Sequence, residues 1–230
     1  MAPIIEITNE VLKGLNQLKI PYILKKENLE KTASIFNKDA FIYVPSINLY
    51  VAKEKIHLNK NWKDCWTELK NQNYQMSKIN EFREFLKYLI SIPTNQEYQN
   101  IYNEFTEVRN PWRAEWLDAN FKVENKGVYI LTENESKKEK LEECLMSNKT
   151  PGISLEDWIN GKNITSQGLP NKNISSGSLY YYYPRSDNNS VARFYADSGW
   201  AFLDCNWFPS GTVSSLGVRP CKAELAGELK

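Results

Sequence analysis

The chain has 230 residues, and its 29 Lys and Arg against 28 Asp and Glu leave a net charge of +1. Such a balance excludes a global field that would hold nucleic acid or an anionic membrane surface. No stretch approaches the roughly 20 apolar residues of a membrane helix, and the N-terminus lacks a basic region followed by an apolar signal core. We therefore expect synthesis in the cytoplasm without a signal peptide, no nucleic-acid partner and no membrane insertion.

The first forty residues differ in pattern from the rest of the chain. A short apolar run at residues 4–7 precedes a helical pattern through Val11, Leu15 and Leu18, and a Lys/Glu-rich segment follows. This predicts a small N-terminal appendage over residues 1–40 and a main domain over residues 41–230. Packing of the appendage on the main domain is favoured over a mount for oligomerisation or attachment, because termini are commonly tied down. A monomer is favoured over an oligomer.

The main domain opens with a strand and two helices. Residues 41–52 read FIYVPSINLYVA, whose β-branched and aromatic content predicts one broken strand or a short hairpin around Pro45. Apolar residues then recur at three- and four-residue spacing in two segments, which predicts two consecutive amphipathic helices. Their apolar stripes are Trp62, Cys65, Trp66 and Leu69, and then Phe82, Phe85, Leu86, Leu89 and Ile90.

The middle of the chain gives mixed signals. The charged run at residues 133–143 predicts a solvated helix, and residues 152–169 predict a long loop with one helical turn at residues 155–159. Arg113, Glu115 and Asp118 are interpreted as a structural ion-pair cluster rather than a catalytic group, because no histidine, cysteine or phosphate-binding loop lies nearby. That cluster is expected to lie under two tryptophans, Trp112 and Trp116.

Cysteine and histidine are too sparse to suggest a metal centre. The four cysteines, Cys65, Cys144, Cys205 and Cys221, are expected to be small buried hydrophobes rather than a disulfide scaffold or a zinc site. A bridge between Cys205 and Cys221 is the only plausible disulfide, because both lie in expected terminal strands. His57, the only histidine, is expected at the surface. The sequence thus predicts no cofactor and no metal.

The C-terminal segment is rich in strands. Turn signals at residues 187–189, 198–199 and 209–211 bound strands that predict an antiparallel β-rich region. Small or apolar residues at alternate positions suit a buried face, and polar and large aromatic residues interleave with them. The expected buried set is Phe194, Ala196, Ala201, Leu203 and Cys205.

The interleaved set would place several large rings on the surface. Monomeric proteins rarely expose such a patch unless a partner binds it. A sandwich buried on both faces is the alternative, and Asp197 and Asp204 argue against it because a buried unpaired carboxylate is costly. The pattern therefore favours a contact surface.

One stretch, VARFYADSGWAFLDCNWFPSGTVSSLGVR, resembles the variable proteins of diversity-generating retroelements. In that family adenines of a copied template are replaced at random, and most of the interleaved residue types are reachable from an Asn codon in this way. The closing SSLGVRP is similar to the family's Gly-Phe-Arg ending, with Val218 in place of Phe, whereas the Arg-Gly-Gly-Ser-Trp signature is absent. The resemblance covers residues 190–220 and, by the strand–helix–helix order, residues 41–89.

The resemblance implies an α+β C-type-lectin-like fold, related to the formylglycine-generating-enzyme branch, with two helices and a C-terminal antiparallel β-rich region that displays the variable residues at about 190–220. It also implies a non-enzymatic protein that binds a variable protein or cell-surface target, on a virion or a cell surface. The expected ligand-binding residues are Tyr195, Asp197, Gly199, Trp200, Phe202, Asp204, Asn206, Trp207, Phe208, Gly211, Thr212 and Val213.

Two other functions remain as alternatives. A calcium-dependent carbohydrate-binding lectin would use carboxylate and amide oxygens, but the usual Glu-Pro-Asn, Gln-Pro-Asp and Trp-Asn-Asp signatures are missing. An enzyme of the formylglycine-generating type needs a cysteine-based copper site, which Cys205 and Cys221 could imitate, and no supporting ligand pattern accompanies them.

Overall fold

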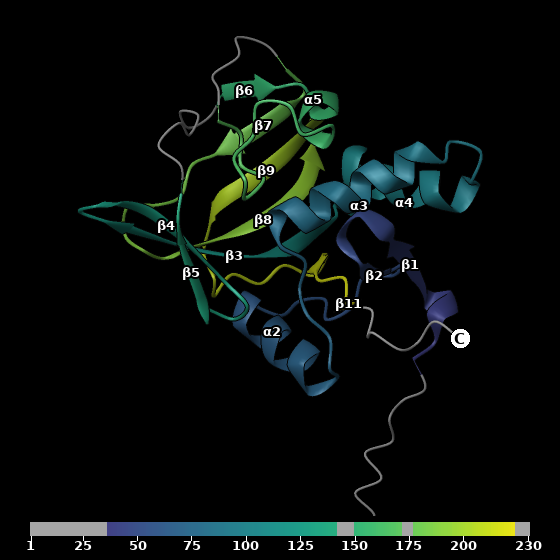
Figure 1. Cartoon of the computed structure of the whole chain (residues 1–230), viewed down its shortest axis with the longest axis horizontal. Coiled ribbons are helices and arrows are strands. Elements are labelled where there is room, and N and C mark those ends of the chain that lie inside the picture. The colour runs from purple at the N-terminus through teal and green to yellow at the C-terminus, as the bar shows by residue number, and fades with distance from the viewer. Residues whose placement is uncertain (1–35, 142–149, 172–176, 224–230) are drawn as a thin grey trace, which may run out of the picture. The chain divides into compact units, whose positions relative to one another are not determined.

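The computed structural model describes residues 36–141, 150–171 and 177–223 (Figure 1). Residues from Lys38 onward group into one compact unit. Most of the expected N-terminal appendage, residues 1–35, lies outside the described residues, so its packing on the main domain stays a prediction. Within the described residues, no helix is long and apolar enough to cross a membrane.

The compact unit is a mixed α+β domain with two sheets. Its helices are α2 (Trp62–Asn71), α3 (Ile79–Ser91), α4 (Gln96–Thr106) and α5 (Leu155–Ile159). Its strands are β1 (Phe41–Val44), β2 (Leu49–Ala52), β3 (Ala114–Glu124), β4 (Gly127–Thr132), β5 (Lys137–Lys140), β6 (Thr150–Ile153), β7 (Leu179–Tyr182), β8 (Ser190–Asp197), β9 (Trp200–Trp207), β10 (Leu216–Gly217) and β11 (Cys221–Ala223).

The small sheet joins the two ends of the domain. Strands β1 and β2 form the expected hairpin, with a 3-10 turn that begins at Pro45 and ends at Asn48 in a left-handed conformation (φ 51°). Strand β2 also pairs antiparallel with β11, and Ile56 bridges to Val218. These pairings join the first hairpin of the domain to its last strand.

The large sheet has the order β5-β4-β3-β8-β9-β7-β6, with β10 beside β3. Strands β8 and β9 form an antiparallel hairpin whose turn residues, Ser198 and Gly199, both have positive φ (49° and 83°), as tight hairpin turns require. Strand β7, however, runs parallel to β9, and β10 runs parallel to β3. The expected purely antiparallel C-terminal region is thus wrong in these two pairings.

Two of the three long helices match the sequence pattern. Helices α2 and α3 bury the expected apolar stripes except Ile90, which is half-buried. Asn61 caps α2 by accepting a hydrogen bond from the Asp64 amide at 2.9 Å. Helix α4 is additional to the two expected helices. It is capped by Asn95 and buries only Ile101 and Phe105. The apolar periodicity that would predict a helix from the sequence is therefore short.

The charged run after β4 is a strand rather than a helix. Glu133, Asn134 and Glu135 adopt positive φ and turn the chain into β5, which pairs antiparallel with β4. Helical turns cannot include three consecutive left-handed residues, so the expected solvated helix is wrong over its described part, residues 133–141. Lysines on β5 protect an exposed sheet edge from pairing with another chain.

The core lies on both faces of the large sheet. Helices α3 and α4 cover one face (Figure 1). On that face, Phe194 of β8 packs against Phe82 at 5.1 Å and Trp158 at 5.6 Å between ring centroids. We call this the inner face. On the opposite, outer face, Trp116 of β3 packs with Trp62 of α2, whose indole N–H donates to the Leu117 carbonyl at 2.8 Å. Helix α2 thus covers the β3 end of the outer face.

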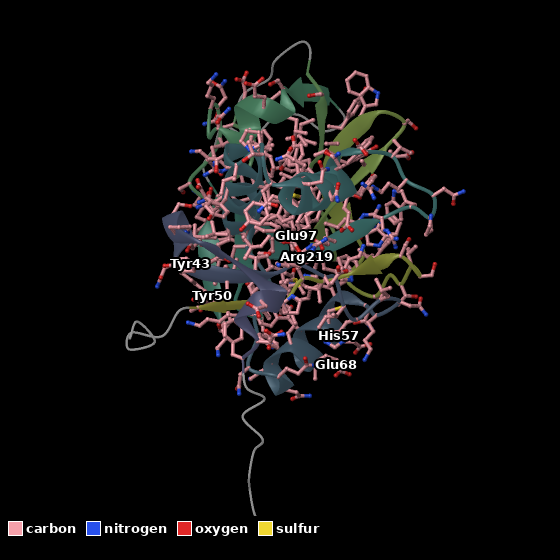
Figure 2. All side chains as sticks on the ribbon, turned by 90° about the vertical axis from the view of Figure 1, so that its right-hand side faces the viewer. Tyr43, Tyr50, His57, Glu68, Glu97 and Arg219 are labelled. Atoms are coloured by element: carbon pink, nitrogen blue, oxygen red, sulfur yellow. The ribbon has the colours of Figure 1, made fainter. Side chains whose placement is uncertain are left out.

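A buried arginine near the end of the domain, Arg219, forms ion pairs with two carboxylates. Arg219, labelled in Figure 2, is 3 % exposed, with its Nε 2.7 Å from Glu115 Oε1 and its Nη2 2.5 Å from Glu104 Oε2. It also stacks over Phe105 at 4.8 Å from the ring centroid. Burial raises the pKa of Glu115, and the Arg219 cation opposes that rise.

The prediction that Arg113, Glu115 and Asp118 form one ion-pair cluster is therefore wrong. Glu115 pairs with Arg219, and Asp118 accepts instead from the Trp66 indole N–H at 3.1 Å and the Glu133 amide at 2.7 Å. Both carboxylates are buried, as a structural role requires.

The described cysteines are separate buried thiols. Cys65, Cys205 and Cys221 are free, so the bridge between Cys205 and Cys221 is not formed, and Cys144 lies outside the described residues. Burial raises the pKa of Cys65 to about 12 and that of Cys205 well above its ordinary value. Thiols of this kind are poor nucleophiles.

Candidate functional site

The outer face of β7, β8 and β9, together with the loop after β9, carries the side chains that the sequence assigns to binding. In the β8–β9 hairpin, Arg193 lies opposite Asp204, Tyr195 opposite Phe202, and Asp197 opposite Trp200. Residues paired in register point to the same side of a sheet, so these side chains share one face. We call each such cross-strand pair a row. Strand β7 adds a third residue to two of the rows, because Tyr180 pairs with Phe202 and Tyr182 with Asp204.

The middle row is a ladder of stacked rings. Phe202 stacks on Tyr195 with centroids 4.8 Å apart and planes 4° apart, and on Tyr180 at 5.2 Å and 27°. Trp112, from the loop before β3, continues the ladder by an edge contact with Tyr195 at 5.1 Å. Because rings flank Phe202 on both sides, it is only 9 % exposed, and the expectation that it lies at the surface is wrong.

The next row contains a buried ion pair. Arg193 Nε donates to Asp204 Oδ2 at 2.9 Å, and both side chains are buried. Asp204 was expected at the surface because an unpaired buried carboxylate is costly, but its cationic partner offsets that cost. The expected exposure of Asp204 is therefore wrong. Burial and the neighbouring Asp204 raise the pKa of Tyr195.

The two ends of β9 remain accessible. Trp200 at the start of the strand is 39 % exposed, and Phe208 just past its end is 41 % exposed. Tyr180 touches Trp200 edge-on at 5.3 Å, and the Arg185 guanidinium lies 4.4 Å from the Phe208 ring centroid. Beside that second end is an open groove of about 570 Å³ lined by Val123, Tyr183, Pro184, Arg185, Ser186, Asp187 and Asn206.

The loop after β9 is packed more tightly than its composition indicates. The indole of Trp207 is half-buried, and a Cβ added to Gly211 would lie 2.5 Å from Trp207 Nε1. Asn206 donates from Nδ2 to the Tyr183 carbonyl at 3.0 Å, and Val213 packs against the α2 core. These residues hold the loop in place in addition to any contact they make with a ligand.

The twelve residues expected to bind thus fall into three groups by exposure. The exposed ones are Asp197, Gly199, Trp200, Phe208 and Thr212; the half-buried ones are Tyr195, Asn206, Trp207, Gly211 and Val213; the buried ones are Phe202 and Asp204.

Sequence reasoning missed four contributors to this face: Tyr180, Tyr182, Trp112 and Arg185. All of them lie outside residues 190–220. The two tyrosines flank the buried Tyr181, so alternation within β7 could have assigned them to the outer face. Trp112 carries no such signal, because a loop brings it to Tyr195.

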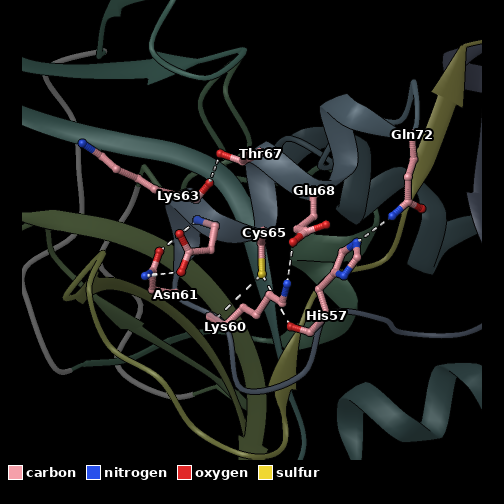
Figure 3. Close-up of polar contacts among 9 residues, drawn as sticks. His57, Lys60, Asn61, Lys63, Cys65, Thr67, Glu68 and Gln72 are labelled. Atoms are coloured by element: carbon pink, nitrogen blue, oxygen red, sulfur yellow. Dashed lines mark hydrogen bonds and ion pairs between the residues drawn. The ribbon is translucent and has the colours of Figure 1, made fainter. Parts of the chain in front are cut away.

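The surroundings of the only histidine are structural. His57 Nε2 lies 3.4 Å from Gln72 Nε2, while Cys65 Sγ lies 3.6 Å from the His57 carbonyl and 3.8 Å from that of Lys60 (Figure 3). Burial lowers the pKa of His57, and Glu68 pairs with Lys60 at 2.6 Å. Among the described residues, no group of three or more His, Cys, Asp or Glu side chains could hold a metal ion.

Comparison with known proteins finds no family model, no curated protein and no solved structure that matches the chain.

Proposed function

We propose that this chain is a non-enzymatic binding protein, and that the outer face of β7, β8 and β9 with the following loop binds a protein or cell-surface target. The observation that carries the proposal is the exposure of two large rings, Trp200 and Phe208, at opposite ends of β9. Large exposed aromatics at the rim of a packed aromatic surface are typical of protein-binding sites.

The dimensions of the face favour a macromolecular partner. Eight residue steps separate Trp200 from Phe208, and a strand rises about 3.3 Å per residue, so the two rings lie roughly 25 Å apart. A ligand that contacts both must be extended. Between the two ends, stacked rings give a rigid surface, which lowers the entropy cost of binding.

We further propose that the fold is C-type-lectin-like and that the chain is a variable protein of a diversity-generating retroelement, acting on a virion or a cell surface. Two features support this proposal. Strands β2 and β11 pair at the ends of the domain, and helices α2 and α3 follow the first hairpin. The hairpin β8–β9 and the loop after it then carry the residues that the resemblance marks as variable.

Site-specific photo-crosslinking tests the proposed face. A photo-reactive phenylalanine analogue at Trp200 or Phe208 should crosslink the same partner in the cells that naturally make the protein. Leu58 and Val108, which are 45 % and 52 % exposed, are the matched control positions. Unlabelled wild-type protein should compete, whereas a variant with Trp200→Ala and Phe208→Ala should not.

Two outcomes would contradict the proposal. One is a product that forms equally well from Leu58 or Val108, since this would show contact unrelated to the outer face. The other is competition by the double variant as strong as that by wild type, since the two rings would then contribute nothing to binding.

A further inference from the structure

Arg193 is a buried cation of the outer face. It is 5 % exposed, and three aromatic rings surround its guanidinium. The guanidinium carbon lies 3.4 Å from the centroid of Trp207, 4.7 Å from that of Tyr195 and 5.5 Å from that of Trp112. Asp204 accepts a hydrogen bond from its Nε at 2.9 Å.

This arrangement places one cation in contact with residues from three separate parts of the chain. Trp112 comes from the loop before β3, Tyr195 from β8, and Trp207 from the end of β9. A guanidinium attracts the faces of aromatic rings and at the same time donates hydrogen bonds in its own plane. Lysine, whose ammonium group is not planar, cannot combine these two properties.

We propose that Arg193 is the positioning residue of the binding face, and that its stacking fixes the orientation of Trp207 and hence the surface that the end of β9 presents. The inference rests on the proposed function, because it explains how that face keeps its shape. Arg193 itself is buried and does not touch the partner.

Contacts around Trp207 support this role. Arg193 covers one side of the indole, Phe208 meets it edge-on at 6.1 Å, and Gly211 lies against its Nε1 edge. The indole N–H is buried and has no hydrogen-bond partner in the described structure. The position of Trp207 therefore depends on stacking and shape, and the loss of the planar guanidinium removes its main contact.

The first test is ligand-free. In the full-length chain, the indole N–H signals of the tryptophans are compared between wild type and Arg193→Lys, which keeps the charge near Asp204 and removes the planar group. The Trp207 signal should shift and broaden. Trp62 and Trp158 should not change, since both donate to core carbonyls at 2.8 Å.

The matched control is Arg83→Lys. Arg83 is also buried, but it donates to the Ile159 carbonyl at 2.7 Å on the inner side of the sheet. This variant should leave the Trp207 signal in place. If Arg193→Lys fails to fold, the pair Arg193→Met with Asp204→Leu removes both charges at similar volume, and should fold with a displaced Trp207.

The second test measures the binding face with a defined probe, a synthetic single-domain antibody selected on wild type and retained only if Phe208→Ala, next to Trp207, weakens its binding. Arg193→Lys should weaken this antibody by about tenfold or more, as the loss of one positioned anchor predicts. Arg83→Lys should leave its affinity unchanged.

The inference is overturned if Trp207 keeps its signal and the antibody its affinity in Arg193→Lys, because Arg193 would then serve only as the counter-ion of Asp204. It is also overturned if Arg83→Lys has the same effects, because a general loss of rigidity would explain both. The antibody measures the shape of the face whether or not a natural partner binds there. The two proposals can therefore fail separately: failed crosslinking would contradict the proposed function, whereas unchanged antibody affinity would contradict the role of Arg193.

Discussion

The inner and outer faces of the β8–β9 hairpin use different interactions although they belong to the same sixteen strand residues. On the inner face, Phe194 and Leu203 are fully buried against helices and neighbouring rings. On the outer face, a stacked ladder and the pair of Arg193 with Asp204 fill the space, and Trp200 remains exposed. Helices bury one face, whereas side chains of the other face bury one another.

Because the outer face is filled by its own side chains, its order depends on a few specific pairs. An inner-face residue loses contact with many neighbours when it is truncated, so its effect scales with buried volume. An outer-face residue has either a few specific partners, as Asp204 has in Arg193 and the Asn206 amide, or few native contacts, as at Trp200. Single substitutions should therefore separate the two faces.

Loss of the Asp204 carboxylate should have the largest effect. Asp204→Ala leaves the buried Arg193 cation unpaired, and breaking a buried pair in this way costs about 3–5 kcal/mol of the free energy of unfolding. Denaturant titration measures the change. The paired substitution Arg193→Met with Asp204→Leu should recover most of the loss, and a double variant as unstable as Asp204→Ala would show that the charge is not the cause.

Truncation on the inner face should come next. Leu203 is fully buried against the inner core, so Leu203→Ala should cost about 2–5 kcal/mol through lost burial and the cavity that remains. The same denaturant titration gives the value. If Leu203→Ala proves neutral while Trp200→Ala unfolds the chain, the assignment of the two faces is inverted.

A pH titration tests one buried carboxylate of β3. Burial without a closely paired cation raises the pKa of Asp118 from 3.8 to about 7. Because the folded-state pKa of Asp118 is the higher one, its stabilising contribution is complete below about pH 4 and is lost as the pH rises toward 7.

Asp118→Asn should therefore flatten the pH dependence of unfolding between pH 4 and 7, by at most about 1.4 kcal/mol per pH unit. The difference between wild-type and variant curves is the quantity to compare, since burial also raises the pKa of Glu81 in the same direction. Parallel curves would show that Asp118 does not titrate in this window.

The smallest effects should come from the exposed rings. Trp200→Ala and Phe208→Ala should each change the free energy of unfolding by no more than about 0.5 kcal/mol, because exposed side chains lose few native contacts. Phe202→Ala is the comparison on the same strand and face and should cost clearly more, since that ring is stacked on both sides. Equal losses at Trp200 and Phe202 would show that Trp200 is packed.

Patterns local in sequence predicted much of the fold. Period-two alternation identified the inner-face residues of β8 and β9, and three- to four-residue spacing identified α2 and α3. The helical turn of α5 was also predicted at its observed residues. In each case the signal comes from neighbours within one element.

What the sequence did not predict depends on contacts between distant segments. Alternation assigned Phe202 and Asp204 to the outer face correctly, but it cannot show that Tyr180 and Arg193 cover them there. The turn of three left-handed residues before β5 was likewise hidden, since Asn134 alone among them favours that conformation. Residue type and alternation predict which side of the sheet a side chain occupies. Contacts with residues from other segments of the chain determine how exposed that side chain is.

The close approach of Gly211 to Trp207 also limits how related chains can differ. A methyl group at position 211 would collide with the indole nitrogen, so a larger residue there is compatible only with a smaller or displaced side chain at position 207. The two positions should therefore change together across homologous sequences. In a homologue in which Gly211 alone is replaced, the Trp207 indole would be displaced. A second replacement at position 207 by a smaller residue would remove the collision.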